Sequence, residues 1–101
     1  MVDFPRLCLE EATMRSEKES LLKDELRLLA IRTRDRLDLT QREMAERLEM
    51  SESSYSDIET GVYMCGTLTT MLLLLMQEDP RGFLQALDEA FAKQYEGLLL
   101  T

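Results

Sequence analysis

Apolar residues recur along this chain at intervals of three and four, which is the spacing of one face of an α-helix. Leu22, Leu26 and Leu37 belong to the first such series. Ser16 opens the series with an S-x-x-E pattern, which is typical of a capping box at a helix N-terminus. The spacing therefore predicts a first helix over residues 17–36.

The segment before that helix, residues 1–15, mixes apolar and acidic residues. Pro5 lacks an amide hydrogen and is expected to break a helix there. We predict an N-terminal arm, with a short additional helix as the alternative that the sequence does not decide.

Two short helices are predicted in the middle of the chain. Thr40 is a good N-cap for the first of them, and Glu43 three residues later completes a capping box. Ser51 is the N-cap of the next, and Gly61 ends it in a left-handed conformation. The residues expected to face the core from these helices are Met44, Ala45, Leu48, Tyr55 and Ile58.

The last third of the chain predicts two more helices. Thr67 is expected to cap a helix over residues 68–78. Residues 72–76 of this helix are all apolar, so the helix must be buried on more than one side. Asp79 followed by Pro80 is typical of a helix start and predicts a fifth helix. Since no alternating strand pattern occurs, we expect an all-α fold of about five helices.

The stretch from Arg34 to Gly61 carries a longer motif. It reads Arg, four residues, Leu-Thr-Gln, three residues, Ala, two residues and Leu, and it continues through Ser51 to Tyr-Ser-x-Ile-Glu-x-Gly. This pattern closely resembles the Cro/XRE-type helix-turn-helix family, to which many phage repressors and bacterial regulators belong. The resemblance covers about residues 26–78 and implies a lambda-repressor-like helix-turn-helix domain with an extra C-terminal helix.

The predicted organisation is an arm at residues 1–15, a helix-turn-helix domain at 16–79 and a C-terminal helix at 80–101, the last as a dimerisation element. The small Ala45 suits a close crossing of two short helices. Arg34 and Glu59 are candidates for an internal ion pair between the first and third helices, an arrangement similar to that of the family.

The resemblance also implies which residues contact DNA. Gln41, at the start of the second helix, would face a phosphate. Independently of the resemblance, the distribution of charge makes Arg36 and Arg42 candidates for phosphate contacts, because the arginines near the motif lie in the first two helices. The third helix would supply the remaining contacts to bases and phosphates, from Glu52, Ser53, Ser54, Ser56 and Asp57. The alternative for all of them is an ordinary solvated helix surface.

The charge of the chain argues against strong DNA binding. The chain has 101 residues with 12 basic and 20 acidic side chains and a net charge of -8, which argues against a partner held by bulk electrostatics, such as nucleic acid or an anionic membrane. Residues 21–50 carry 7 basic and 7 acidic side chains, whereas residues 51–101 carry 2 and 8. We therefore expect few phosphate contacts, modest affinity and a shallow salt dependence.

The sequence departs from the family pattern in three respects. Glu52 and Asp57 are acidic where basic or neutral polar residues are usual, and the loop at residues 62–66 has no cation. Asp38 and Glu49 stand where turn glycines are expected, and Glu49 tolerates a left-handed conformation poorly, so we expect that turn to differ in shape.

Two functions remain open. The first is a transcriptional regulator that binds double-stranded DNA as a homodimer. Its partner surface would come from the predicted apolar fourth helix together with an apolar face of the fifth helix, formed by Leu84, Leu87, Phe91, Tyr95 and Leu98. In the other reading, that helix packs on its own domain. The second function is a helix-turn-helix protein-interaction module, similar to an anti-repressor or antitoxin, with weak or no DNA binding.

Catalysis is not expected. The chain has no histidine, no Gly-rich phosphate loop and no clustered metal ligands, so we predict neither enzymatic activity nor a cofactor or metal. Cys8 and Cys65 match no metal-ligand spacing, and we interpret them as free thiols, with a disulfide as the alternative. The N-terminus does not resemble a signal peptide and the apolar run 71–76 is too short to span a bilayer, so we expect a cytoplasmic protein with no membrane partner.

Overall fold

The computed structural model describes the backbone of residues 4–100 and the side chains of residues 15–93. Over that backbone the chain forms five helices and no strand, which confirms the all-α prediction. The helices are α1 (Phe4–Leu37), α2 (Gln41–Arg47), α3 (Glu52–Glu59), α4 (Thr67–Leu75) and α5 (Pro80–Leu100).

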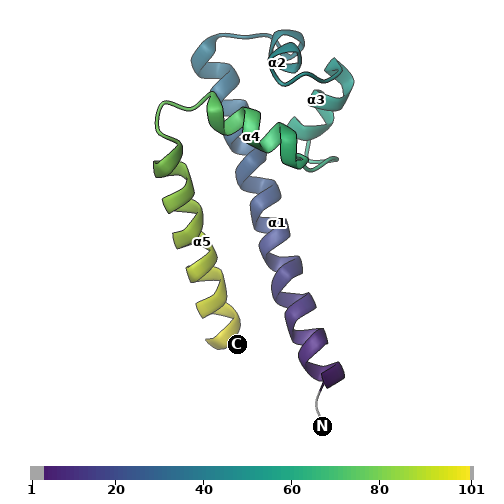
Figure 1. Ribbon diagram of the computed structural model, residues 1–101, viewed down its shortest axis with the longest axis vertical. Coiled ribbons are helices and arrows are strands. Elements are labelled where there is room, and N and C mark those ends of the chain that lie inside the picture. The colour runs from purple at the N-terminus through teal and green to yellow at the C-terminus, as the bar shows by residue number, and fades with distance from the viewer. Residues whose placement is uncertain (1–3, 101) are drawn as a thin grey trace.

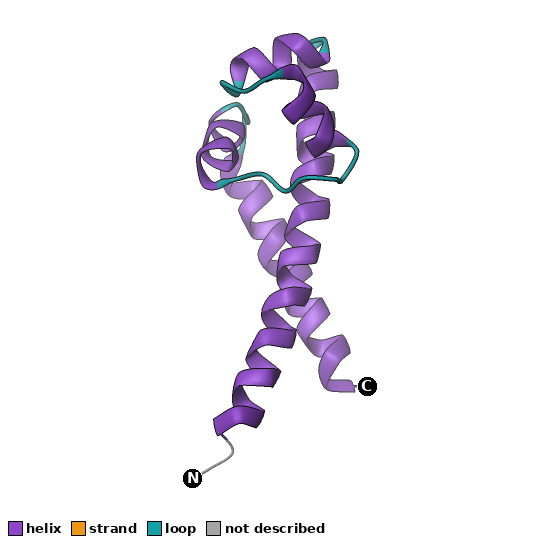
Figure 2. Cartoon of the chain, turned by 90° about the vertical axis from the view of Figure 1, so that its right-hand side faces the viewer, coloured by secondary structure: helices purple, strands orange, loops and turns teal. Residues whose placement is uncertain are grey.

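The short helices α2, α3 and α4 gather around the C-terminal part of α1, and together they make a head that spans residues 26–76 (Figure 1). From this head α5 runs back antiparallel to α1, so both chain ends lie at the far end of the molecule (Figures 1 and 2). The molecule measures 54 × 26 × 20 Å and its radius of gyration is 16.2 Å. A compact domain of this length has a radius near 13 Å, so the molecule is elongated along α1 and α5.

The core lies inside the head, where every helix from α1 to α4 contributes. Its buried apolar residues are Leu26, Leu29, Ala30, Met44, Ala45, Leu48, Tyr55, Ile58, Cys65 and Leu73. All five residues expected to face inward from the two middle helices are therefore buried. Cys65 is a free thiol, and its burial raises its pKa; the side chain of Cys8 lies outside the described residues.

The first helix starts much earlier than the sequence predicts. α1 has 34 residues and runs without a break past Ser16, so the predicted start at residue 17 is wrong. Pro5 falls in the first turn of α1, where an amide hydrogen has no partner within the helix, and a proline is tolerated there. The exposed pair between Arg15 and Glu19, 3.0 Å apart, spans the predicted boundary.

Most of the predicted helix starts are correct. The Thr40 hydroxyl accepts the Glu43 amide at 3.1 Å and the Glu43 carboxylate accepts the Thr40 amide at 2.9 Å, which completes the capping box. Ser51 accepts the amide of Ser54 at 3.2 Å. The carboxylate of Asp79 likewise accepts the amide of Gly82 at 3.0 Å, at the start of α5.

The prediction for α4 is wrong in its details. Gly66 and not Thr67 is the N-cap residue, and the helix ends at Leu75. Within the apolar run, Leu73 is fully buried and its neighbours Leu72 and Leu74 pack partly against the core. Leu75, however, is 79% exposed, so the expectation that the whole run is buried fails at its end.

Three helix ends share one turn geometry, in which a residue just beyond the helix lies in the left-handed region. These residues are Asp38 at φ 55°, Glu49 at φ 57° and Gly61 at φ 83°. After α2, the amide of Glu49 bonds the carbonyl of Glu46 at 3.1 Å and that of Met50 bonds Ala45 at 3.0 Å, which is the Schellman pattern. Glu49 thus adopts the conformation usual for glycine, and the expectation of a different turn is wrong.

Candidate nucleic-acid interface

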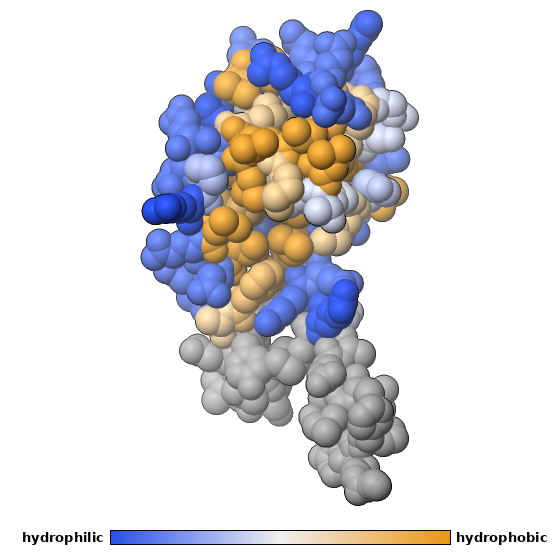
Figure 3. Space-filling model, viewed as in Figure 1, coloured by the Kyte–Doolittle hydropathy of each residue, from blue (hydrophilic) through white to orange (hydrophobic). Residues whose placement is uncertain are grey.

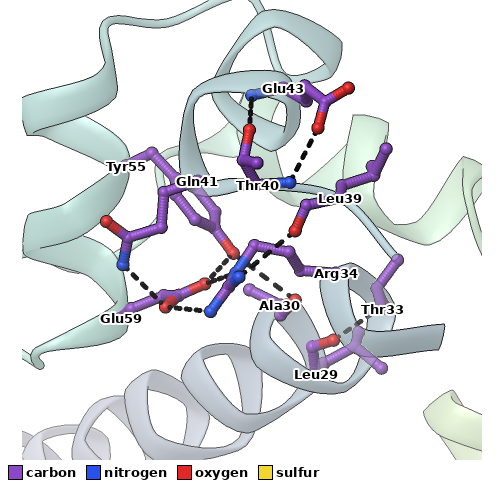
Figure 4. A network of polar contacts seen from close by, with 10 residues as sticks. All are labelled: Leu29, Ala30, Thr33, Arg34, Leu39, Thr40, Gln41, Glu43, Tyr55 and Glu59. Atoms are coloured by element: carbon purple, nitrogen blue, oxygen red, sulfur yellow. Dashed lines mark hydrogen bonds and ion pairs between the residues drawn. The ribbon is translucent and has the colours of Figure 1, made fainter. Parts of the chain in front are cut away.

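A polar network centred on Glu59 joins α1, α2 and α3 (Figure 4). Arg34 from α1 binds it with two nitrogens, Nε to Oε2 at 2.6 Å and Nη2 to Oε1 at 3.1 Å. Gln41, the first residue of α2, donates its amide Nε2 to Oε1 at 3.0 Å. The Tyr55 hydroxyl, one turn earlier on α3, donates to Oε2. One carboxylate therefore receives hydrogen bonds from three helices.

Burial decides the electrostatics of this network. The Glu59 side chain is only 8% exposed, and burial alone would raise its pKa, but hydrogen bonds from Arg34, Tyr55 and Gln41 together lower the pKa below its ordinary value. Burial and the adjacent carboxylate raise the pKa of Tyr55. Glu59 is thus an anion and Tyr55 a neutral donor at neutral pH, so the network persists there.

Arg34 also holds the turn that leads into α2. Its Nη1 donates to the carbonyl of Leu39 at 3.2 Å, while Nη2 of the same guanidinium donates to Glu59. Since Arg34 belongs to α1, one side chain fixes both the entry to α2 and the end of α3 on the first helix. The short helices α2 and α3 thereby acquire a set position relative to each other.

The outward side of α3 is polar. Glu52, Ser53 and Asp57 are exposed, and within the described part of the chain their side chains form no hydrogen bond or ion pair. At the helix start, the Ser51 hydroxyl donates to the hydroxyl of Ser54 at 2.9 Å. Ser56 is half-buried. The core therefore holds one face of α3, while the opposite face is open to a ligand.

The other residues expected to contact phosphate differ in how far they are engaged. Gln41 is half-buried and already shares its amide with Glu59. Arg42 is exposed, with its Nε 3.7 Å from the carboxylate of Glu46. Arg36 donates to the carbonyl of Met76 at 2.8 Å and lies 3.4 Å from the carboxylate of Glu78, so it binds the C-terminal end of α4.

A second polar contact between α1 and α4 was missed by the sequence reasoning. Gln77 donates Nε2 to the hydroxyl of Thr33 at 2.8 Å and to the carbonyl of Leu73 at 2.9 Å. Thr33 is buried and donates in turn to the carbonyl of Leu29 at 2.7 Å. A threonine on an otherwise apolar helix face was the available signal, because a buried hydroxyl requires a partner.

The apolar face of α5 lies partly against α1. Leu87 and Phe91 are half-buried, and the ammonium group of Lys18 lies 5.6 Å from the centre of the Phe91 ring. Leu84 is 49% exposed. The side chains of Tyr95 and Leu98 lie outside the described residues.

Among the described residues, no group of three or more acidic or cysteine side chains is placed to hold a metal ion. No helix in the described part of the chain is both long enough and apolar enough to cross a bilayer.

Comparison with known protein families gives a match over most of the described helices. The family model described as a helix-turn-helix domain matches residues 24–92, which is more than half of the chain and covers α2, α3, α4, the C-terminal part of α1 and the first part of α5. Neither a curated protein nor a solved structure matches the chain significantly. The matched region contains the Glu59 network and the outward face of α3, and on this match the chain belongs to the helix-turn-helix domain family.

Proposed function

We propose that this protein is a sequence-specific DNA-binding transcriptional regulator of the Cro/XRE type that acts as a homodimer. The observation that carries the proposal is the outward face of α3. Its exposed polar side chains lie opposite Tyr55 and Ile58, which are buried, and the Glu59 network holds the helix in place. A short helix held this way can present several side chains to the major groove with little loss of conformational freedom.

Each exposed residue of this surface has a role in the proposal. Ser53 and Asp57 read bases, with the Asp57 carboxylate as an acceptor for the amino group of a cytosine. Arg42 contacts a phosphate and exchanges its exposed partner Glu46 for that contact. The other proposed contacts come from Glu52, Ser54, Ser56, Gln41 and Arg36. Arg36 would use the guanidinium N–H groups that do not already bind the end of α4.

Few cations support this surface, which sets the expected affinity. Residues 51–101 contain only two basic side chains, Arg81 and Lys93, and both belong to α5. Each protomer therefore neutralises few phosphates. A homodimer compensates for this, because two half-sites about 34 Å apart are bound at once.

A mobility-shift titration with pooled fragments of the source genome tests the proposal. We expect a shift at 50 mM salt that weakens only modestly at 200 mM, and an enriched sequence motif with two-fold symmetry among the bound fragments. If no fragment shifts at 50 mM salt, the protein is not a DNA-binding regulator.

Two substitutions assign the roles within that assay. Arg42→Ala is expected to weaken binding to all sequences similarly and to reduce the salt slope by about one. Asp57→Asn is expected to relax the preference at one base pair, since an amide can both donate and accept. Arg81→Ala, an exposed arginine on α5, is the matched control and should leave binding unchanged.

A second candidate is a protein-interaction module, and the acidity of α3 favours it. Glu52 and Asp57 are exposed carboxylates, and residues 61–66 supply no cation beside them. Such a surface attracts a basic protein partner as readily as it repels phosphates. Failure of every DNA fragment to bind, together with hydrogen-exchange protection of α3 by a basic partner, would favour this function.

A further inference from the structure

The exposed apolar surface of the head is concentrated on α4. Leu68, Met71 and Leu75 follow one another at helical spacing and are 64%, 50% and 79% exposed. Figure 3 shows apolar side chains gathered over α4 on the face turned to the viewer. We name these three residues the α4 surface. The other large apolar side chains exposed among the described residues flank α4 in the chain, and they are Val62, Tyr63 and Leu84.

The core does not use this surface. Thr69 and Leu73, on the opposite side of α4, are the residues that the core buries. At 100° per residue, the α4 surface lies within an arc of about 60°, and the two buried residues lie well outside that arc. A monomer therefore buries little of the leucine side chains at positions 68 and 75, and their exposure to water remains unfavourable.

The segment that carries the α4 surface is also uncharged. Residues 61–77 contain no acidic or basic side chain, although 32% of the whole chain is charged. The surrounding protein is strongly acidic, with a net charge of -8. An uncharged apolar patch within an acidic molecule limits which partner can cover it.

We propose that a second copy of this chain docks on the α4 surface, so that α4 packs against α4 of its partner. Two molecules of charge -8 repel each other, and they meet at least cost where neither presents a charge. A basic partner would gain no electrostatic attraction from this segment, and an anionic membrane would be repelled by the rest of the molecule. The proposal rests on the proposed homodimer and names its interface.

The size of the surface fits a weak dimer. The three side chains of the α4 surface expose roughly 350 Å² per copy, less than half of the about 800 Å² per partner in a standard interface. Contact through a two-fold axis places the same patch on both sides, as a closed homodimer requires. The expected assembly is a dimer in concentration-dependent exchange with monomer.

The sequence suggested a partner surface on the fourth and fifth helices together, and the contacts within the protomer favour α4 over α5. Leu87 and Phe91 are half-buried in the single chain, with Lys18 of α1 over the Phe91 ring, so these side chains already have contacts within the protomer. Leu84, which precedes them on α5, is 49% exposed.

Sedimentation velocity from about 1 to 200 µM tests the proposal on the full chain. Wild-type protein is expected to pass from monomer to dimer over this range, and Leu75→Glu is expected to raise the dissociation constant at least tenfold. Because Leu75 is 79% exposed, its substitution should leave the circular dichroism and melting temperature of the monomer unchanged. Ser53→Glu, which places the same charge on the exposed face of α3, is the matched control and should dimerise like wild type.

Three results would overturn the proposal. They are a wild-type protein that stays monomeric at 200 µM, a Leu75→Glu variant that dimerises like wild type, and a monomer that binds phosphatidylcholine vesicles through the α4 surface instead. The same two variants separate this proposal from DNA binding. If no DNA fragment shifts but Leu75→Glu still dissolves the dimer, the function fails while the interface stands. If Leu75→Glu dimerises normally while Ser53→Glu loses a DNA shift that wild type shows, the interface fails while the function stands.

Discussion

The helices α3 and α4 are nearly equal in length, with eight and nine residues, and each buries one face in the same core. Their outward faces are opposite in character. α3 exposes carboxylates and hydroxyls, whereas α4 exposes leucine and methionine and carries no charge. Core packing sets the inner faces, so the difference between the outer faces reflects what each meets outside the protomer. The α3 face suits a hydrated polar ligand, and the α4 face suits a dry contact.

The two helices are also attached to α1 by different means. α3 is held through Glu59, a carboxylate shared by three donors. α4 is held by Leu73 in the core and by hydrogen bonds of Gln77 and Arg36 near its C-terminal end. The attachment of α3 therefore depends on ionisation, while most of the attachment of α4 does not.

The largest expected change in stability distinguishes the buried face of α4 from its exposed face. Leu73→Ala removes a side chain with no exposed surface and should lower the free energy of unfolding by about 3 kcal/mol. Leu75→Ala, two residues later, should change it by less than about 0.5 kcal/mol when measured on the monomer. Urea unfolding at low protein concentration gives both values. Equal losses for the two variants would mean that the outer face of α4 contributes to the fold as much as its inner face does.

The second largest loss of stability is expected when the attachment of α3 to α1 is broken. Arg34→Ala leaves Glu59 buried without its cation and leaves the carbonyl of Leu39 without its donor. Losing one partner of a fully buried pair costs about 3–5 kcal/mol, and since Arg34 is 24% exposed we expect about 2 kcal/mol from urea unfolding. Arg32→Ala truncates an exposed arginine of the same helix and is the control. Its free energy of unfolding should lie within about 0.5 kcal/mol of the wild-type value. A loss below 1 kcal/mol for Arg34→Ala would show that packing alone holds α3.

Acid should weaken α3 selectively, and the sign follows from the lowered pKa of Glu59. Above its ordinary pKa of 4.5, Glu59 is ionised in both the folded and the unfolded chain, so its contribution is fully present. As the pH falls below 4.5 towards the lower folded pKa, the unfolded chain takes up the proton first and that stability is lost. Melting temperatures from pH 7 to pH 3 should therefore fall more steeply for wild type than for Glu59→Gln. Glu52→Gln, on the outer face of the same helix, should keep the wild-type slope.

Sequence reasoning was most successful where one residue decides a local geometry. Thr40 and Ser51 begin helices because their hydroxyls accept a backbone amide, and this requires only neighbours in the chain. The apolar spacing likewise identified Tyr55 and Ile58 as core residues. The spacing of the motif paired Arg34 with Glu59, but it did not indicate that Tyr55 and Gln41 share the same carboxylate.

The failures come from contacts between distant parts of the chain. An S-x-x-E pattern at Ser16 also suits the middle of a helix, and only the continuous α1 shows that no helix starts there. The all-apolar run near Leu75 does not reveal which residues stay exposed, because that depends on how α4 lies on the core. The use of Arg36 as a donor to Met76 joins residues 40 positions apart, and no local pattern predicts it.

The smallest expected effect concerns the turn before α3. Glu49 has φ 57°, in a region that costs a residue with a Cβ about 1 kcal/mol or more, so Glu49→Gly should stabilise the protein by about 0.5–1 kcal/mol. Glu46→Gly, within α2, removes the same charge at an ordinary helical position and should destabilise by up to about 1 kcal/mol. Urea unfolding distinguishes the two variants by sign. If Glu49→Gly destabilises the protein instead, the turn requires the glutamate side chain itself.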